Sequence, residues 1–362
     1  MMKPNLLELY SDYLISSFGQ TSATGLSNLL EGEISHDSIT RLLSKELLTP
    51  KDYWLIVKKT IRQIESDDGV IIIDDSIEEK PYTDENDIIC WHYDHCKDRS
   101  IKGINFLTAI YYSNGLTIPV TYQLVAKTEL VTDKKTGKQK RISPKTKNEY
   151  FREMLVSCKQ NSIIFRFVIS DVWYSSAENM MFIKKNIERD FVMPLKSNRK
   201  VALNKTDKLN GRYQALPTVQ IEPNTVREIY LEGVDFPMLL LKQVFANADG
   251  STGILYLVTS DSTLDYDLIT TIYKRRWKVE EYHKSLKQNA SLEKSPTKTV
   301  VTQSNHFFAS MVAYYKIELL KQVSKCNHFA LKAKIYMKAL QSAFKELENL
   351  KKMYPDITIA VA

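Results

Sequence analysis

Three features that mark secreted, membrane or disulfide-stabilised proteins are scarce or missing in this sequence. Its 362 residues include 4 cysteines, and their spacing is irregular (Cys90, Cys96, Cys158 and Cys326). This argues against a disulfide framework. The chain shows no N-terminal apolar segment of the signal-peptide type, and no run approaches the roughly eighteen apolar residues of a membrane-spanning helix. We therefore expect a reduced, cytoplasmic protein.

The composition is that of a globular, mildly basic chain. Lys and Arg number 50 against 43 Asp and Glu, which gives a formal net charge of +7, and 43% of residues are hydrophobic. A chain of this length and apolar content has enough material for two or three structural units. The excess of positive charge favours polyanionic partners, although a moderate excess of Lys also occurs in proteins that bind nothing charged.

The first 66 residues or so have a helical pattern. Leucines recur at helical spacing up to the break at Gly32, after which Ser35 can cap a second short helix that carries Ile39, Leu42 and Leu43 on one side. Two short helices joined by a Gly-containing turn resemble a helix-turn-helix, which makes Arg41 a candidate DNA contact. A helical cap on the core is the alternative interpretation.

Apolar runs after residue 66 predict five strands and an intervening helix. The first strand, Val70-Ile71-Ile72-Ile73, is followed by Asp74-Asp75-Ser76, and the other predicted strands cover 104–112, 118–125, 163–169 and 191–195. A turn at Asn114-Gly115 joins the second and third. A basic loop over 134–147, which either contacts DNA or is simply solvated, precedes a helix that ends near Lys159.

Asp171 follows the fourth predicted strand and has no evident structural role. Ser175-Ser-Ala-Glu178 already supplies a capping box for the next helix, so Asp171 is not needed as its cap. If its strand lies beside the first one, its carboxylate comes close to Asp74 or Asp75. Because successive strand residues point to opposite faces, only one of that pair can share a metal site with Asp171.

The most informative segment is the helix predicted to begin near Asp265, after a β-rich stretch over 197–260. Tyr273, Arg276, Glu280 and Lys287 are separated by steps of three, four and seven residues, which places all four on one helix face. A carboxylate among cations and a phenol suits a metal ion and the phosphates around it. An amphipathic surface helix with an ordinary Arg276–Glu280 pair is the alternative.

This pattern resembles the YREK motif of a group of bacterial insertion-sequence transposases, which belong to the DDE transposases. The order of strands, aspartates and Glu helix is similar to their RNase H-like core. The resemblance implies an α/β fold with an RNase H-like mixed sheet, flanking helices, a β-rich insertion before the last catalytic helix, and helical terminal regions. The expected divisions are a helix-turn-helix-like region (1–66), the first part of the core (67–196), the insertion (197–260), the Glu helix (261–292) and a C-terminal helical region (293–362).

The resemblance also implies the site residues. Asp74, Asp171 and Glu280 are expected to be catalytic and to bind two Mg²⁺ ions per active site, with Mn²⁺ as a substitute; Asp75 is the fallback for Asp74. Arg276 and Lys287 are expected to hold phosphates and Tyr273 the DNA backbone. Trp277 matches a Trp that braces a flipped base in some relatives, although a core Trp would have the same sequence pattern.

The implied function is cut-and-paste transposition of an insertion sequence, by metal-dependent cleavage of the element's ends and strand transfer into target DNA. The implied partners are those DNA ends, target DNA and a second copy of the chain, in the bacterial cytoplasm and on the nucleoid. The apolar stripe of Phe307, Phe308, Met311, Val312 and Tyr315 is a candidate pairing surface. The alternatives are a nuclease or resolvase without transposition, and a non-catalytic DNA-binding descendant.

The segment Cys90-Trp-His92-Tyr-Asp-His95-Cys96 invites interpretation as a zinc site. Its spacing is tighter than that of the Cys/His patterns that bind zinc. We therefore expect a loop near the active site or near DNA.

Overall fold

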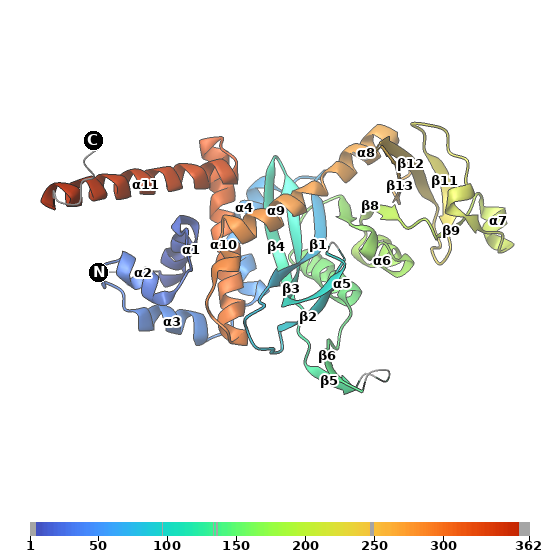
Figure 1. Ribbon diagram of the computed structural model, residues 1–362. Coiled ribbons are helices and arrows are strands. Elements are labelled where there is room, and N and C mark those ends of the chain that lie inside the picture. The colour runs from blue at the N-terminus through green and yellow to red at the C-terminus, as the bar shows by residue number, and fades with distance from the viewer. Residues whose placement is uncertain (1–4, 96, 133, 135–136, 247–249, 355–362) are drawn as a thin grey trace. The chain divides into compact units, whose positions relative to one another are not determined.

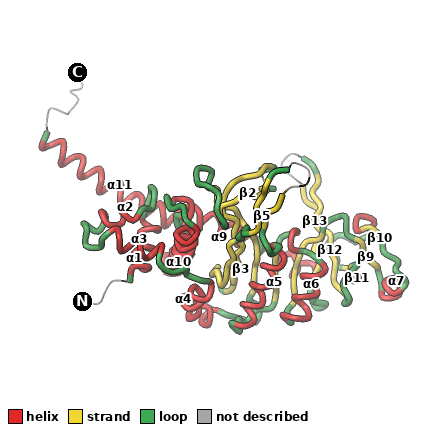
Figure 2. The backbone as a smooth tube through the Cα atoms, turned by 90° about the horizontal axis from the view of Figure 1, so that it is seen from below, coloured by secondary structure: helices red, strands yellow, loops and turns green. Residues whose placement is uncertain are grey.

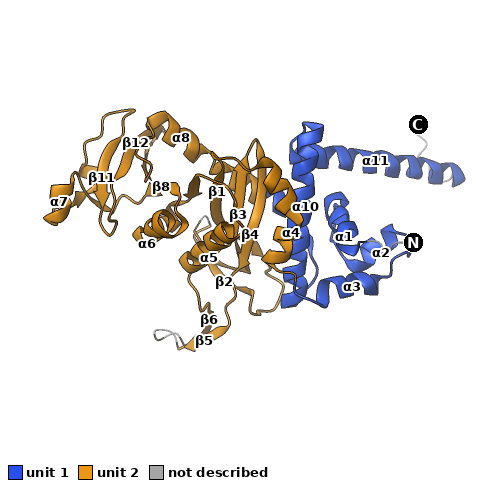
Figure 3. Ribbon diagram, turned by 180° about the vertical axis from the view of Figure 1, so that it is seen from behind, with its two compact units in different colours: residues 1–47, 284–362 blue, residues 48–283 orange. Residues whose placement is uncertain are grey.

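The computed structural model describes residues 5–95, 97–132, 134, 137–246 and 250–354. The chain divides into two compact units, shown in different colours in Figure 3. We call Leu48–His283 the core unit, and Met1–Leu47 together with Lys284–Ala362 the terminal unit. Each unit is described by itself.

The core unit is built on one mixed sheet. Eleven strands of the described chain form it, in the order β10-β9-β11-β12-β13-β8-β7-β1-β3-β2, with β4 also paired to β3. The strands are β1 (Val70–Glu79), β2 (Ile89–Asp94), β3 (Arg99–Ser113), β4 (Leu116–Leu124), β7 (Phe167–Ser170), β8 (Asp190–Leu195), β9 (Lys200–Ala202), β10 (Gln214–Ala215), β11 (Arg227–Leu231), β12 (Met238–Ala246) and β13 (Thr252–Thr259). The basic loop folds into a separate hairpin, β5 (Glu129–Thr132) and β6 (Gln139–Ile142).

The central strands explain the fold class. β1 pairs antiparallel with β3 and parallel with β7, and β7 pairs parallel with β8. The four residues Val70, Ile71, Ile72 and Ile73 are completely buried, as expected for a strand covered on both faces. The order β4-β3-β1-β7-β8 is that of an RNase H-like sheet, so the predicted α/β fold is confirmed.

Two details of the predicted sheet are wrong. β1 does not end at the aspartates but continues to Glu79, because β3 is long enough to pair with all ten of its residues. The segment expected to be a loop around Cys90 is β2, which pairs with β3. The expected β-rich insertion over 197–260 joins the same sheet, since β13 pairs antiparallel with β8 and extends it.

Helices cover both faces of the sheet. The helices of this unit are α4 (Pro50–Ile64), α5 (Lys147–Gln160), α6 (Ala177–Phe182), α7 (Lys205–Leu209), α8 (Tyr266–Lys274) and most of α9 (Trp277–Gln288). Figure 2 shows α5 and α6 side by side against the strands. α9 lies on the other face, where the Tyr282 hydroxyl is 3.5 Å from that of Thr108 and the His283 ring packs edge-on against Phe106.

The Glu-bearing helix is broken, which corrects the expectation of one continuous helix from Asp265. Asp265 does cap α8, but α8 ends at Lys274 and α9 begins at Trp277 (Figure 1). Between them the amides of Arg275 and Arg276 bond to carbonyls three residues back, as in a 3₁₀ turn. Tyr273 and Glu280 therefore belong to different helices, with Arg276 in the turn between them.

The terminal unit is helical. It contains α1 (Leu6–Ser16), α2 (Ala23–Leu29), α3 (His36–Ser44), α10 (Val300–Ser324) and α11 (His328–Met353). Buried polar contacts join its two chain segments: the Tyr10 hydroxyl is 3.0 Å from His306 Nδ1, and Asn305 Nδ2 donates to the Leu43 carbonyl at 2.9 Å. α10 packs on α1, α3 and α11.

Two expectations about the terminal regions change. The boundary lies at 47/48 and not at 66, because α4 packs on β4 and so belongs with the sheet. The stripe proposed as a pairing surface is mostly buried: Phe307, Phe308, Met311 and Val312 are at most 3% exposed. These side chains are part of the core that holds α10 in place, so they are not available to a second copy.

Across the part of the chain that the structure describes, none of the helices has the length and apolar content needed to cross a bilayer.

Gly103 provides a test of the sheet register. It lies on β3 opposite Glu79 and Cys90, and a Cβ placed there would stand 2.2 Å from the backbone oxygen of Glu78. We expect Gly103→Ala to lower the free energy of unfolding by about 1–3 kcal/mol, because a backbone atom cannot move aside as a side chain can. Urea unfolding followed by circular dichroism measures this. Gly19→Ala, where a Cβ meets nothing within 4 Å, is the control, and equal stability of the two variants would contradict the register.

Candidate active site

Asp74 and Asp171 lie side by side on neighbouring parallel strands. The register of β1 and β7 pairs Ile73 with Ser170, so the next residue of each chain segment is one of these aspartates. The sequence suggested that Asp171 has no structural role. In the structure its Oδ1 accepts a hydrogen bond from the Trp173 amide at 2.9 Å and caps a 3₁₀ turn over Val172–Tyr174. The expected capping box is also wrong, because Ser176 caps α6. One carboxylate oxygen of Asp171 caps the turn.

Asp75 points to the opposite face and has its own partners. Its Oδ2 accepts from Lys147 Nζ at 2.6 Å and from Asn105 Nδ2 at 3.2 Å, and its Oδ1 accepts from the Tyr174 hydroxyl at 2.6 Å. Burial by itself would raise the pKa of Asp75, but Lys147 and these hydrogen bonds hold it below the ordinary value. Asp75 is thus a satisfied, ionised group on the α5 side of the sheet.

Asp74 is in the opposite electrostatic situation. Burial first, and then the neighbouring carboxylates Asp171 and Asp75, raise its pKa to about 8. Burial also raises the pKa of Asp171. Two buried carboxylates that disfavour each other's charge are stabilised in ionised form by a cation placed between them.

The turn between α8 and α9 places Arg276 near these two aspartates. Arg276 lowers the pKa of Asp74 and Asp171, and its Nη2 forms an ion pair with Glu280 Oε1 at 2.7 Å. Burial raises the pKa of Tyr273 to about 12, and the negative charges of Asp171 and Asp74 contribute to this rise. The structure therefore brings Asp74, Asp171, Tyr273, Arg276 and Glu280 into one neighbourhood.

The remaining predicted DNA contacts lie on accessible parts of the chain. The Trp277 side chain is 59% exposed, which rules out the core-Trp alternative, and the Arg276 guanidinium lies 5.3 Å from the centre of its ring. Lys287 is half-buried on the last turn of α9 and belongs to the terminal unit. Arg41 is exposed on α3 and donates to Ser38 Oγ at 3.4 Å. Their roles in binding DNA stay predictions.

The donor set suits a hard cation. Asp74, Asp171 and Glu280 offer only oxygen ligands, as Mg²⁺ and Mn²⁺ prefer. Burial and the neighbouring carboxylates raise the pKa of Asp74, so a cation bound there would stabilise its ionised form. Within the described residues, no three His, Cys, Asp or Glu side chains are already grouped around one point where an ion could sit. Glu280 is instead paired with Arg276.

Sequence reasoning missed the residues that hold Asp75. Lys147 was counted among the cations of a basic loop, and Tyr174 was not singled out. The capping box of Thr146 and Glu149 starts α5 at Lys147, and that signal was present in the sequence. Which buried group the first residue of α5 reaches depends on the packing of α5 against the sheet.

The residues of the cysteine and histidine segment do not form a metal site in the described part. Cys90 is buried, and its Sγ lies 2.9 Å from the Asn86 carbonyl oxygen. Burial, with Lys127 and Lys147 nearby, lowers the pKa of His92 to about 3. Cys96 lies outside the described residues.

The opposite pKa shifts of the two neighbouring aspartates predict opposite responses to pH. A carboxyl group whose folded pKa is raised destabilises the fold as pH rises from its ordinary pKa, about 4, towards the folded value of about 8. Without metal, Asp74→Asn should therefore gain thermal stability over wild type as pH approaches 8, and added Mg²⁺ should stabilise wild type but not the variant. Thermal melts in EDTA across this pH range measure the difference.

Asp75→Asn is the matched control and should behave in the opposite way. The lowered pKa of Asp75 means that its charge stabilises the fold above its ordinary pKa and that this contribution is lost in acid. This variant should be less stable than wild type at neutral pH. Parallel melting profiles for wild type and Asp74→Asn would contradict the assignment.

Comparison with known proteins agrees with this geometry. The sequence matches the family described as DDE superfamily endonuclease over residues 3–229, which is more than half of the chain. The match includes Asp74 and Asp171 and ends before Glu280. No curated protein matches the chain. The RNase H-like sheet, the paired strand aspartates and this match lead to one conclusion: the chain belongs to the DDE superfamily endonucleases.

Proposed function

We propose that this endonuclease is a transposase, which cuts the ends of an insertion sequence and joins them to target DNA by a cut-and-paste route. The family establishes a nuclease-type enzyme that acts on DNA. The finer assignment is supported by the neighbourhood of Tyr273, Arg276 and Glu280 beside the two aspartates. That grouping is the observation on which the proposal depends.

Each residue has a distinct role in the proposal. Asp74 is the first metal ligand, because Asp75 is already engaged by Lys147 and Tyr174, and Asp171 and Glu280 are the second and third. Two Mg²⁺ ions, or Mn²⁺ in their place, would supply an activated water and stabilise the leaving 3′ oxygen of an in-line displacement.

Arg276 has to change partners when this site is loaded. In the structure it neutralises Glu280 and lies close enough to Asp74 to lower its pKa. Once cations compensate the carboxylates, the guanidinium is free to hold a phosphate oxygen of the cleaved strand. Arg276 thus compensates part of the negative charge of the site without metal and binds DNA when metal is present.

The DNA contacts are assigned to residues of the motif and to Arg41. Tyr273 contacts the strand that is not transferred, Lys287 binds a phosphate, and Trp277 braces an unpaired base. Arg41 on α3 contacts DNA as well. Exposure of Trp277 and Arg41 supports their roles.

A strand-transfer experiment separates this proposal from its alternatives. DNA flanking the gene is sequenced for inverted repeats, and those ends are incubated with the full chain, Mg²⁺ and a supercoiled plasmid. A transposase yields cut ends covalently joined to the plasmid. Cleavage without joining would favour a nuclease or resolvase, and binding without cleavage would favour a non-catalytic DNA-binding protein.

Glu280→Gln tests the third carboxylate. We expect cleavage to fall at least about a hundredfold, since a lost metal ligand removes several kcal/mol of transition-state stabilisation, while binding to the ends changes little. Glu281→Gln is the matched control, because Glu281 is exposed and pairs only with Lys278 at 2.9 Å among the described ion pairs. Gel assays of cleavage and of end binding read out both variants. If Glu281→Gln proved the more damaging change, the motif register would be wrong.

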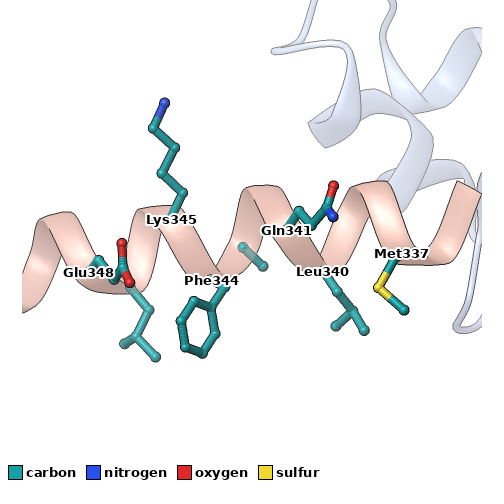
Figure 4. Close-up of a pocket in the computed structure, with 8 residues that line it drawn as sticks. Met337, Leu340, Gln341, Phe344, Lys345 and Glu348 are labelled. Carbon is teal, nitrogen blue, oxygen red and sulfur yellow. The ribbon is translucent and has the colours of Figure 1, made fainter.

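For assembly we propose a homodimer that pairs through α11. This 26-residue helix is about 39 Å long at 1.5 Å per residue. Met337, Leu340 and Phe344 point to one side of it, and Lys345 points to the other (Figure 4). Met337, Leu340, Phe344 and Leu347 form what we call the α11 stripe. Each of these four side chains is at least 42% exposed.

The α11 stripe suits a second copy of itself. Its spacings of three, four and three residues are symmetric about Ser342, so a twofold axis there pairs Met337 with Leu347 and Leu340 with Phe344 in antiparallel helices. The same operation brings Lys338 of one copy opposite Glu346 of the other. Apolar and charged positions are thus both self-complementary.

Phe344→Glu tests this pairing. The side chain is 66% exposed, so the variant should fold normally, while a charge at the centre of the paired stripe should convert a dimer to a monomer in light scattering. Leu209→Glu, at a 76% exposed position on α7, is the control. Removal of residues beyond about Lys325 should abolish paired-end complexes and leave single-end binding intact. Loss of single-end binding with normal pairing would refute the proposal.

A further inference from the structure

An exposed row of aromatic side chains leads to Asp171. Trp91 is 53% exposed and Tyr93 49% exposed on β2, His95 is exposed just beyond β2, and Trp173, two residues after Asp171, is 45% exposed. We call these four residues the aromatic row. Single exposed aromatics are common on protein surfaces, but adjacent ones beside a candidate active site are not explained by chance exposure.

Three members of the row are in ring contact, and the fourth, Trp91, lies two residues before Tyr93 on β2. The ring centres of Tyr93 and His95 are 4.9 Å apart, and those of His95 and Trp173 are 5.2 Å apart. The Tyr93 hydroxyl donates to Asp98, which fixes the ring. Lys196 Nζ lies 5.2 Å from the centre of the Trp173 ring. The row therefore combines flat apolar faces with a cation at the end nearest Asp171.

The strand register places the row on the same face as Asp74. Trp91 pairs with Lys102 on β3, and Thr108, an even number of residues along β3, pairs with Asp74. Side chains that are paired across strands, or separated by two residues, share a face. Trp91 and Tyr93 thus share the sheet face of Asp74, while His92 between them is buried on the face of Asp75.

We propose that the aromatic row binds unpaired nucleobases of the DNA strand next to the cleaved phosphate, by stacking. Aromatic side chains that alternate with cations are the usual means of holding single-stranded nucleic acid, because every base has a flat face. The row is separate from Trp277, which lies on α9. This inference rests on the proposed function in one respect, namely that DNA is the substrate.

Binding in the absence of metal tests the row without any cleavage. The probe is a fluorescein-labelled oligothymidylate of about 12 nucleotides, compared by anisotropy in EDTA with a blunt duplex of mixed sequence. For the full chain carrying both Trp91→Ala and Trp173→Ala, we expect affinity for the single strand to fall at least about tenfold, since one stacked base is worth a factor of about 5 to 150. Affinity for the duplex, which depends mainly on phosphate charge, should stay within about twofold.

Two further variants make the result decisive. Trp91→Phe with Trp173→Phe keeps flat rings and should restore most of the single-strand affinity. Phe245→Ala removes a 47% exposed ring from β12, which five strands separate from β2 in the sheet, and should change nothing.

The outcomes distinguish the row from the proposed function. Three results would contradict base stacking on the aromatic row: an equal loss of affinity for both probes, an unchanged affinity for the single strand, or a Phe variant that does not recover single-strand affinity. None of these results depends on whether wild type cleaves or joins DNA. Conversely, if the chain binds single strands through the row but never cleaves DNA ends, the proposed transposase function would be wrong and the proposed role of the aromatic row would stand.

Discussion

Asp74 and Asp75 are adjacent on one strand and have opposite electrostatic environments, and the candidate site depends on this difference. Asp75 is ionised and held by Lys147, Tyr174 and Asn105. Asp74 faces Asp171 and is destabilised in its charged form, which raises its pKa to about 8. Asp75 therefore has a structural role. Asp74 and Asp171, which directly follows β7, would be stabilised in their ionised forms by further positive charge.

Arg276 supplies positive charge near Asp74 and Asp171. Its position depends on the break between α8 and α9. A continuous helix would place Tyr273, Arg276 and Glu280 along one face at regular heights. The 3₁₀ turn at Arg275 and Arg276 leaves the guanidinium paired with Glu280 and near enough to the two aspartates to lower their pKa values. The same residue that compensates the carboxylates is thus positioned to meet a phosphate when cations replace it.

Much of this was predictable from local sequence patterns. The central strands follow from hydrophobic runs, and the Tyr273-Arg276-Glu280 spacing is visible in the sequence, whereas the placement of Asp74 beside Asp171 depended on the expectation that their strands are neighbours. Other elements were not predictable. The segment of β2 gives no strand signal because its run of Cys, Trp, His and Tyr has no β-branched apolar core. The polar half of β1 contains no apolar run, and its pairing with β3 continues the strand to Glu79.

What the sequence by itself determined is therefore the presence and approximate position of the central strands and the candidate acidic residues at their ends, since these depend on patterns within short segments, while the fold class followed from the resemblance to a family. Only the tertiary structure decided which of Asp74 and Asp75 is neutralised, because Lys147 and Tyr174 reach Asp75 from 72 and 99 residues away. It also decided that the Phe307 stripe is core while the α11 stripe is exposed, because the same helical periodicity is compatible with either. Burial and charge compensation depend on which segments meet in space, and a one-dimensional pattern does not contain that information.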